Sequence, residues 1–248
     1  MASTSETGHS KNVTNLESLI TSATAFGTSY NPSKDSIKLP ALQTLLSSSK
    51  ETLSAVNTAE SAYSNAVDAR ELEFKPLGKL ITRVNNALKA SDSTTQTDES
   101  AKTIIRKLQG KRASAKLTEE EIKALQAEGK EVTQISVSQM GYDSRLDNFD
   151  KLISLLSTVP QYNPNEEDLK ISSLKALHTK LKTKNTDVVT AYIQLDNARN
   201  NRNEVFYKPL SGLVDLASDS KMYIKSVFGA SSPQFKQVSK LTFIVRDK

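Results

Sequence analysis

The sequence predicts an all-α protein, an elongated antiparallel helical bundle built from two duplicated long-helix units, with a short C-terminal strand as an option. Apolar residues recur at steps of three and four along most of the chain, which is typical of helices with one buried face. Short motifs also recur in the same order further along the chain, which indicates an internal duplication. Because long apolar stripes need partners of equal length, we expect both copies to pack as one bundle. Two separate three-helix domains are the alternative.

The duplication rests on two motifs and on identities between them. Tyr30-Asn31-Pro32 recurs as Tyr162-Asn163-Pro164. Lys75-Pro76-Leu77 recurs, after a slip of one residue, as Lys208-Pro209-Leu210. Further residues between the motifs are identical at the same offset, and this shared order predicts two repeats of one unit.

The chain divides accordingly into four parts. Residues 1–12 carry no periodic apolar positions and are expected to be a disordered tail. Residues 13–109 form helical repeat 1, and residues 136–248 form helical repeat 2. Between them, residues 110–135 are rich in Lys, Glu and Ala, so we expect a mobile linker that carries both basic and acidic residues.

Each repeat is expected to hold helices in the same order, separated by turns. The pattern predicts helices at 13–26, 35–74, 77–88 and 101–108, and again at 146–156, 169–206 and 210–227. Pro76 breaks the first long helix, because proline lacks a donor and clashes with the preceding turn. The Tyr-Asn-Pro motifs are turn chemistry. We expect Tyr30 and Tyr162 to pack over these turns, and a shared ligand site is the alternative.

The end of the chain carries an apolar segment. Its large residues are Leu241, Phe243, Ile244 and Val245, a composition typical of a strand. Because a lone strand needs a partner, we expect this segment to dock on the bundle or on another subunit.

The residue types exclude several kinds of chemistry. The chain has no cysteine, which excludes disulfides, thiolate metal sites and cysteine nucleophiles. His9 lies in the expected tail and His178 on the second long helix, and neither has the neighbours of a triad or of a helical metal site. No Gly-rich phosphate loop occurs either. We therefore expect no metal, no cofactor and no catalytic residue, and a protein that is not an enzyme.

Two glutamates allow alternative interpretations. Glu71 and Glu204 each stand four residues before a Lys-Pro pair. One interpretation is a pair of carboxylates that meet across a twofold axis between the repeats. The simpler one is an ion pair with Lys75 or Lys208 on the same helix, worth a few tenths of a kcal/mol.

The clusters of positive charge are the only feature of the sequence that indicates a class of ligand. A cluster between residues 102 and 117 holds six cations and no anion: Lys102, Arg106, Lys107, Lys111, Arg112 and Lys116. A second basic region at 221–248 holds Lys221, Lys225, Lys236, Lys240, Arg246 and Lys248. Such patches can bind nucleic acid or anionic lipid with a steep salt dependence. A solvated basic face is the simpler interpretation.

These features together predict a non-enzymatic structural or protein-interaction helical bundle, with a protein partner or self-association through the C-terminal segment. A nucleic-acid-associated protein is the alternative. The longest apolar runs span five residues, whereas a transmembrane helix needs about 20, so we expect no transmembrane segment. The first residues lack a secretory signal, and a cytoplasmic location is the expectation.

Four motifs resemble those of a known group of proteins. They are Tyr30-Asn-Pro-Ser-Lys34, Lys38-Leu-Pro-Ala-Leu42, Phe74-Lys-Pro-Leu77 and the run from Val227 to Leu241. With these motifs the chain resembles uncharacterised, internally duplicated helical proteins from Bacteroidetes-type bacteria. The resemblance implies a bacterial origin. It implies no activity, cofactor or catalytic residue.

Overall fold

The computed structural model describes residues 8–111, 118–127 and 140–246. These residues form helices, turns and short extended segments, and no strand occurs among them. The predicted all-α class is therefore confirmed. The described chain divides into two compact units: unit 1 combines residues 1–64 with 190–248, and unit 2 comprises residues 65–189.

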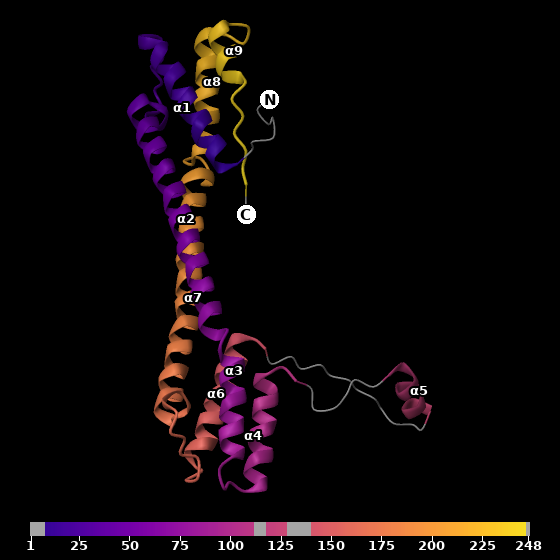
Figure 1. Ribbon diagram of the computed structural model, residues 1–248. Coiled ribbons are helices and arrows are strands. Elements are labelled where there is room, and N and C mark those ends of the chain that lie inside the picture. The colour runs from indigo at the N-terminus through magenta and orange to yellow at the C-terminus, as the bar shows by residue number, and fades with distance from the viewer. Residues whose placement is uncertain (1–7, 112–117, 128–139, 247–248) are drawn as a thin grey trace, which may run out of the picture. The chain divides into compact units, whose positions relative to one another are not determined.

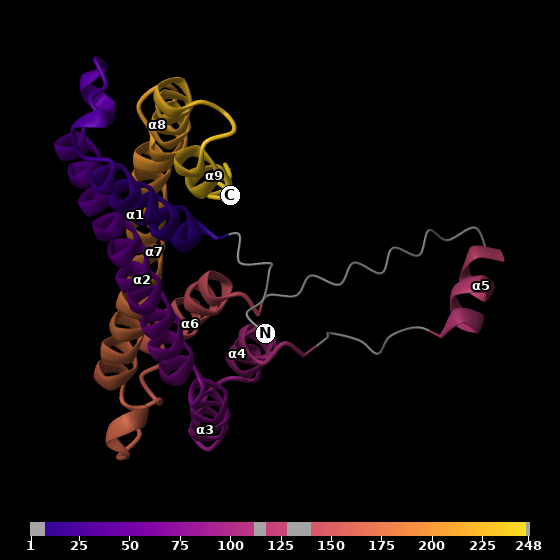
Figure 2. The same ribbon diagram turned by 90° about the horizontal axis from the view of Figure 1, so that it is seen from above.

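Unit 1 is built from both ends of the chain. It holds α1 (His9–Ala25), the first part of α2 (Leu39–Phe74), the last part of α7 (Ile171–Tyr207), α8 (Leu213–Phe228) and α9 (Pro233–Ser239). Helix α1 packs along α8 and α9 (Figures 1 and 2). The apolar stripes of these helices meet in one core, whose fully buried members include Leu16, Leu19, Leu42, Phe206, Leu213 and Ile224. The apolar area that this core removes from water holds the unit together.

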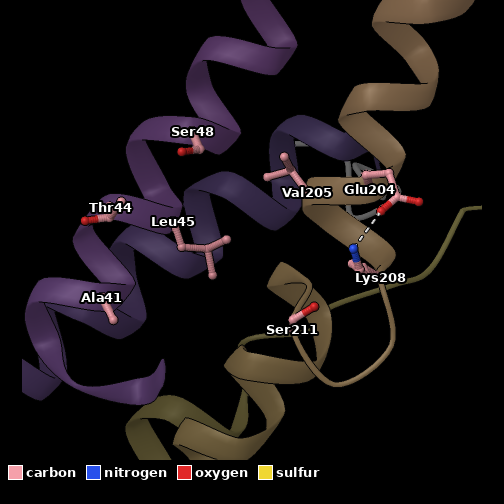
Figure 3. Close-up of a pocket in the computed structure, with 8 residues that line it drawn as sticks. All are labelled: Ala41, Thr44, Leu45, Ser48, Glu204, Val205, Lys208 and Ser211. Atoms are coloured by element: carbon pink, nitrogen blue, oxygen red, sulfur yellow. Dashed lines mark ion pairs between the residues drawn. The ribbon is translucent and has the colours of Figure 1, made fainter. Parts of the chain in front are cut away.

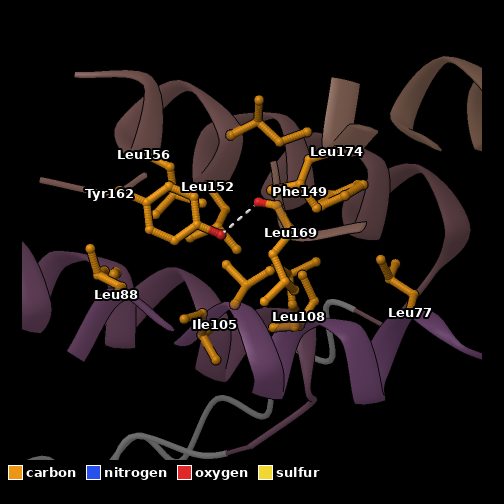
Figure 4. Packing of buried hydrophobic residues seen from close by; sticks show 14 of the residues in the cluster. Leu77, Leu88, Ile105, Leu108, Phe149, Leu152, Leu156, Tyr162, Leu169 and Leu174 are labelled. Carbon is orange, nitrogen blue, oxygen red and sulfur yellow. Dashed lines mark hydrogen bonds between the residues drawn. The ribbon is translucent and has the colours of Figure 1, made fainter. Parts of the chain in front are cut away.

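Unit 2 is built from the middle of the chain. It holds the end of α2, α3 (Leu77–Lys89), α4 (Thr95–Leu108), α5 (Glu119–Ala127), α6 (Tyr142–Ser157) and the first part of α7. Helix α4 packs against both α3 and α6 (Figure 1). Its core is a second, separate cluster, which includes Phe74, Leu77, Ile81, Phe149, Leu152 and Leu174 (Figure 4).

The compact units do not coincide with the two predicted repeats. In unit 1, α1 from the predicted repeat 1 packs on α8 and α9 from the predicted repeat 2. In unit 2, the first helix of repeat 2 shares a core with the third and fourth helices of repeat 1. Helix α2 has 36 residues, of which those up to Ser64 belong to unit 1 and those from Asn65 belong to unit 2. Helices attached to opposite ends of α2 belong to different units.

Several predicted boundaries were wrong. Residues 9–12 of the expected tail belong to α1, and Asn12 is 3% exposed. Residues 1–7 lie outside the described part. Of the expected linker, residues 112–117 and 128–135 also lie outside the described part. Between these two stretches, the linker forms α5. The long helices begin later than predicted, because Asp35–Ile37 and Glu167–Leu169 form separate 3-10 turns before them.

The two Lys-Pro-Leu motifs fold differently, although their sequences match. Leu77 opens α3 and is 2% exposed, whereas Leu210 is 80% exposed in a turn with φ +66°. The predicted helix at 210–227 therefore begins only at Leu213. The reason is the turn itself, because the Gly212 N–H donates to the Lys208 carbonyl at 2.7 Å and the Leu210 N–H donates to Asp215 at 2.7 Å.

Burial along the two helices nevertheless follows one spacing. The buried positions on α3 are Leu77, Ile81, Val84 and Leu88, and those on α8 with the same spacing are Leu213, Ala217, Ser220 and Ile224. Counted by this spacing, Leu77 on α3 corresponds to Leu213 on α8, whereas the Lys-Pro-Leu motifs match Leu77 with Leu210.

Candidate functional site

Each Tyr-Asn-Pro motif forms a turn closed by its own tyrosine. The Tyr30 hydroxyl donates to the Ile37 carbonyl at 2.7 Å, and the Tyr162 hydroxyl donates to the Leu169 carbonyl at 2.9 Å. Both tyrosines are 6% exposed, and Figure 4 shows Tyr162 among the leucines of its core. Burial, reinforced by the nearby carboxylates of Asp168 and Glu166, raises the pKa of Tyr162 to about 12, so its phenol remains a donor.

The first turn packs tightly on α8. The rings of Tyr30 and Tyr223 meet edge to face with centroids 5.4 Å apart, and the Asn31 N–H donates to the Tyr223 hydroxyl at 3.2 Å. Lys34 of the same turn pairs with Asp219 on α8 at 2.5 Å. An aromatic contact and an ion pair thus hold this turn on its helix.

The second turn packs on α3 through an ion pair, without a matching aromatic contact. Arg83 on α3 donates from its two terminal guanidinium nitrogens to the two carboxylate oxygens of Asp168. Ala87 follows Arg83 by four residues, as Tyr223 follows Asp219 on α8. Equivalent positions on the two helices therefore carry a methyl group in unit 2 and a phenol ring in unit 1.

A cavity lies where the second turn meets the alanine. Its volume is about 520 Å³. The lining residues come from the second half of α3 and from the turn: Arg83, Asn86, Ala87, Ala90, Ser91, Gln161, Tyr162, Asn163, Pro164, Asn165, Glu166 and Leu169. The lining combines Tyr162 and Leu169 with amide, hydroxyl and charged side chains.

A groove of about 420 Å³ lies in unit 1 between the first turns of α2 and the end of α7 (Figure 3). Ala41, Thr44, Leu45 and Ser48 line it on α2. On the opposite wall, Glu204 pairs with Lys208 at 3.4 Å, the helix ion pair that the spacing predicts. The groove therefore presents hydroxyl groups and one exposed Glu–Lys ion pair.

An aromatic and aliphatic surface lies on the long helices of unit 1. Tyr192 and Ile193 on α7 are 53% and 52% exposed. The Tyr192 ring contacts the Tyr63 ring of α2 with centroids 5.9 Å apart. Beside these rings, Arg199 and Glu60 form a loose ion pair at 3.8 Å. We call Tyr63, Tyr192 and Ile193 the α7 patch.

The C-terminal segment lies against α1 in an extended form, without a strand. Leu241 and Phe243 pack on the core of unit 1, while Ile244 and Val245 are 39% and 51% exposed. The predicted strand is wrong because asparagine side chains replace a partner strand. Asn12 accepts from the Ile244 N–H at 3.1 Å and donates to the Ile244 carbonyl at 2.8 Å. Asn15 donates to the Thr242 carbonyl at 2.7 Å.

The first basic cluster is only partly described. Lys102 pairs with Glu99 at 3.0 Å on α4, and Lys107 and Lys111 are exposed. Arg106 is half-buried. The remaining two members, Arg112 and Lys116, lie outside the described residues.

In the second basic region, two lysines make internal contacts. The Lys221 ammonium donates to the carbonyls of Ser239 and Leu241, and the Lys225 ammonium lies 5.7 Å from the centre of the Phe235 ring. Lys236 and Lys240 are exposed, and Lys248 lies outside the described residues. Part of this region therefore stabilises the fold of unit 1.

Both histidines contact aromatic rings. His9 Nδ1 shares a hydrogen bond of 2.7 Å with the Tyr207 hydroxyl, and the His178 ring lies 6.1 Å from that of Phe149. In the part of the chain that the structure describes, no three His, Asp or Glu side chains converge on a point where a metal ion would fit.

Sequence patterns missed the residues that distinguish the two turns. Tyr223 and Ala87 lie on helices that the periodicity predicts, but nothing local shows that they occupy equivalent places beside a tyrosine turn. The α7 patch was missed as well, because Tyr192 and Ile193 fit the apolar composition of a buried helix.

Comparison with protein-family models, curated proteins and solved structures found no match. The resemblance to Bacteroidetes-type proteins therefore rests on its four motifs alone. None of the described helices has both the length and the apolar composition needed to cross a membrane.

Proposed function

We propose that this protein is a non-enzymatic helical interaction module that associates with a second copy of itself through the α7 patch. The observation that carries the proposal is the exposure of Tyr192 and Ile193, 53% and 52%, as adjacent large side chains on one helix. Tyrosine and isoleucine at such a place gain free energy when they are covered, and aromatic residues are enriched at the centres of interfaces.

The charges around the patch favour a second copy as the occupant. Arg199 and Glu60 present one cation and one anion beside the rings, and their ion pair is long at 3.8 Å. A twofold contact uses the same surface on both subunits, and an axis that passes near the two rings brings the Arg199 of one copy toward the Glu60 of the other. A surface with both signs is complementary to itself in this arrangement.

The test is the mass of the full chain measured by light scattering after gel filtration, over a wide range of concentrations. We expect a dimer that dissociates on dilution, because one small apolar patch supports only a weak contact. The double substitution Tyr192→Glu and Ile193→Lys should leave a monomer at every concentration. Gln194→Glu, an exposed neighbour on the same helix, is the matched control and should behave as the wild type.

The C-terminal segment is the competing surface for self-association. Leu241 and Phe243 contribute to the core of unit 1, so deleting the segment would damage the fold. Ile244→Asp together with Val245→Asp changes only its exposed side chains. A monomer produced by this pair of substitutions, with the α7 variant still dimeric, would overturn the assignment to α7. A wild-type chain that stays monomeric at high concentration would overturn self-association itself.

The nucleic-acid alternative depends on the exposed cations of the first basic cluster. Lys102, Lys107 and Lys111 are exposed on and after α4. Their joint substitution by Gln should weaken binding to a duplex DNA probe and lower the salt dependence of the binding that remains. Binding that is absent in the wild type at low salt would reject this alternative.

The same proposal includes an internal duplication. It is supported by the tyrosine bonds, since Tyr30 and Tyr162 each donate to the carbonyl seven residues further on. The shared spacing of buried positions on α3 and α8 supports it as well. Under this interpretation each unit combines the first helix of one repeat with the third helix of the other.

A further inference from the structure

We propose that the cavity between the second Tyr-Asn-Pro turn and Ala87 of α3 is a binding site for a phenolic ring. The inference goes beyond self-association, because this cavity lies in unit 2 and the α7 patch lies in unit 1. Its basis is a comparison of the two Tyr-Asn-Pro turns. Beside the first turn the chain places the Tyr223 ring, and beside the second turn lies a cavity.

In unit 1 the place is filled by the chain itself. The Tyr223 ring stands edge to face against Tyr30 at 5.4 Å, and its hydroxyl accepts from the Asn31 N–H at 3.2 Å. The first turn thus already binds a phenol, with an aromatic contact for the ring and a backbone donor for the oxygen.

In unit 2 the place is open. The second turn keeps the same closing tyrosine, 6% exposed and bonded to the same relative carbonyl. The helix beneath the turn keeps the ion pair, through Arg83 and Asp168, but has Ala87 where α8 has Tyr223. A cavity of about 520 Å³ borders that alanine. The unit therefore keeps the closing tyrosine and has no second ring beside it, while its Asn163 N–H, at the place of the Asn31 N–H, donates to the Gln161 carbonyl at 3.0 Å.

The polar lining adds groups that a phenol hydroxyl can use. Asn86, Ser91 and Gln161 supply amide and hydroxyl groups that donate and accept hydrogen bonds. Arg83 is already paired with Asp168, and Glu166 adds one further negative charge, so the lining disfavours an anion. A neutral phenol satisfies this lining better than benzene, which has no hydrogen-bonding group.

A phenol can reach the cavity from two sources: as a free small molecule, or as a tyrosine side chain presented by another protein. The experiment uses two probes, p-cresol for the first and N-acetyl-tyrosine amide for the second. Toluene, which has the ring without the hydroxyl, is the control ligand. Binding of both phenols leaves the site open to both sources, whereas binding of p-cresol alone restricts it to free small molecules.

The probes are titrated into the full chain, and binding is followed by calorimetry and by the amide NMR signals of Gln161 and Asn163. We expect one p-cresol per wild-type chain, shifts at both amides, and weaker binding of toluene. Ala87→Tyr should fill the cavity from within, abolish binding and raise the unfolding temperature.

The reciprocal variant keeps the test decisive if Ala87→Tyr fails to fold. Tyr223→Ala opens the corresponding place in unit 1, and cavities opened in this way can take up an aromatic molecule. It should bind two molecules of p-cresol per chain and recover thermal stability when p-cresol is added. Binding of p-cresol to Tyr223→Ala in unit 1 but not to the wild type would overturn the proposal, as would wild-type binding that moves neither Gln161 nor Asn163. Failure of these tests leaves the dimer measurement on the α7 patch unaffected.

Discussion

Arg83 on α3 and Asp219 on α8 occupy equivalent positions, six residues after the first buried leucine of each helix, and carry opposite charges. Each pairs with a turn residue of the other sign: Arg83 with Asp168 and Asp219 with Lys34. Exchanging the turns between the two helices would place Lys34 beside Arg83 and Asp168 beside Asp219. The two ion pairs therefore favour the observed combination of turns and helices over the exchanged one.

Reversal of one of these charges should destabilise unit 1, and reversal of both should restore it. Asp219→Lys places a second cation beside Lys34, and we expect the free energy of unfolding to fall by up to about 1 kcal/mol, the scale of exposed ion pairs. Adding Lys34→Asp should recover most of that loss. Urea unfolding at low and high salt measures both effects, and salt should shrink the difference. A double variant no more stable than Asp219→Lys would contradict this role of the pair.

Two glycines near the Lys-Pro-Leu motifs should respond oppositely to alanine. A Cβ at Gly212 would lie 2.7 Å from the Lys208 nitrogen, whereas a Cβ at Gly78 on α3 meets nothing within 4 Å. We expect Gly212→Ala to lower the free energy of unfolding by about 1–3 kcal/mol through overpacking. Gly78→Ala should raise it by about 0.4–1 kcal/mol, because alanine restricts the unfolded chain. Thermal unfolding of both variants measures these changes. Equal changes in unfolding temperature would show that the turn at Gly212 rearranges to accommodate the methyl group.

His9 should make the stability of unit 1 sensitive to mild acid. Burial, followed by the charges of Arg202 and Arg246, lowers the pKa of His9 from its ordinary value of 6.5. Between that value and the lowered one, the unfolded chain binds a proton that the folded chain does not. Stability is therefore full above about pH 6.5 and falls as the pH drops below it.

The variant His9→Gln isolates this contribution from the other titrating groups. We expect its free energy of unfolding to change less than that of the wild type between pH 7 and pH 5, as measured by urea unfolding at each pH. Parallel profiles for the two proteins would show that His9 takes up its proton equally in both states.

Asn12 should control how firmly the C-terminal segment is held on α1. Asn12→Ala removes two hydrogen bonds to the main chain of Ile244, which should lower the exchange protection of the Ile244 amide by about 5- to 30-fold, the factor for 1–2 kcal/mol. Amide hydrogen exchange followed by NMR gives the value. Thr14→Ala is the matched control, since Thr14 is exposed on the same helix and bonds only within it. Equal protection in both variants would mean that the remaining contacts of the segment, through Asn15, Lys221 and the buried Leu241 and Phe243, are sufficient to hold it.

Helix ends were predictable where the stop signal is local. The first helix was expected to end near Gly27, and α1 ends at Ala25, two residues before Gly27 adopts φ +59°. The first long helix was expected to end before Pro76, and α2 ends at Phe74. The beginnings were less predictable, because the apolar periodicity continues through the 3-10 turn Asp35–Ile37.

Most features of the candidate sites could not be predicted from the sequence. The Tyr-Asn-Pro turns were identified, and Tyr30 and Tyr162 close them, because turn residues act on their immediate neighbours. The cavity depends on Ala87 facing a turn about 75 residues away in the chain, a contact that leaves no local pattern. The match of Leu77 with Leu210 was misleading, since a short turn moves the start of α8 to Leu213.

By itself the sequence determined the all-helical class and the breaks at Lys75-Pro76 and at the Tyr-Asn-Pro turns, because periodicity and proline act within a few residues. Only the tertiary structure decided that α1 packs on α8 and that α4 packs on α6. An apolar stripe accepts any partner of suitable shape, so it does not specify which one. Contacts between residues far apart in the sequence make that choice, and they form only once the chain has folded.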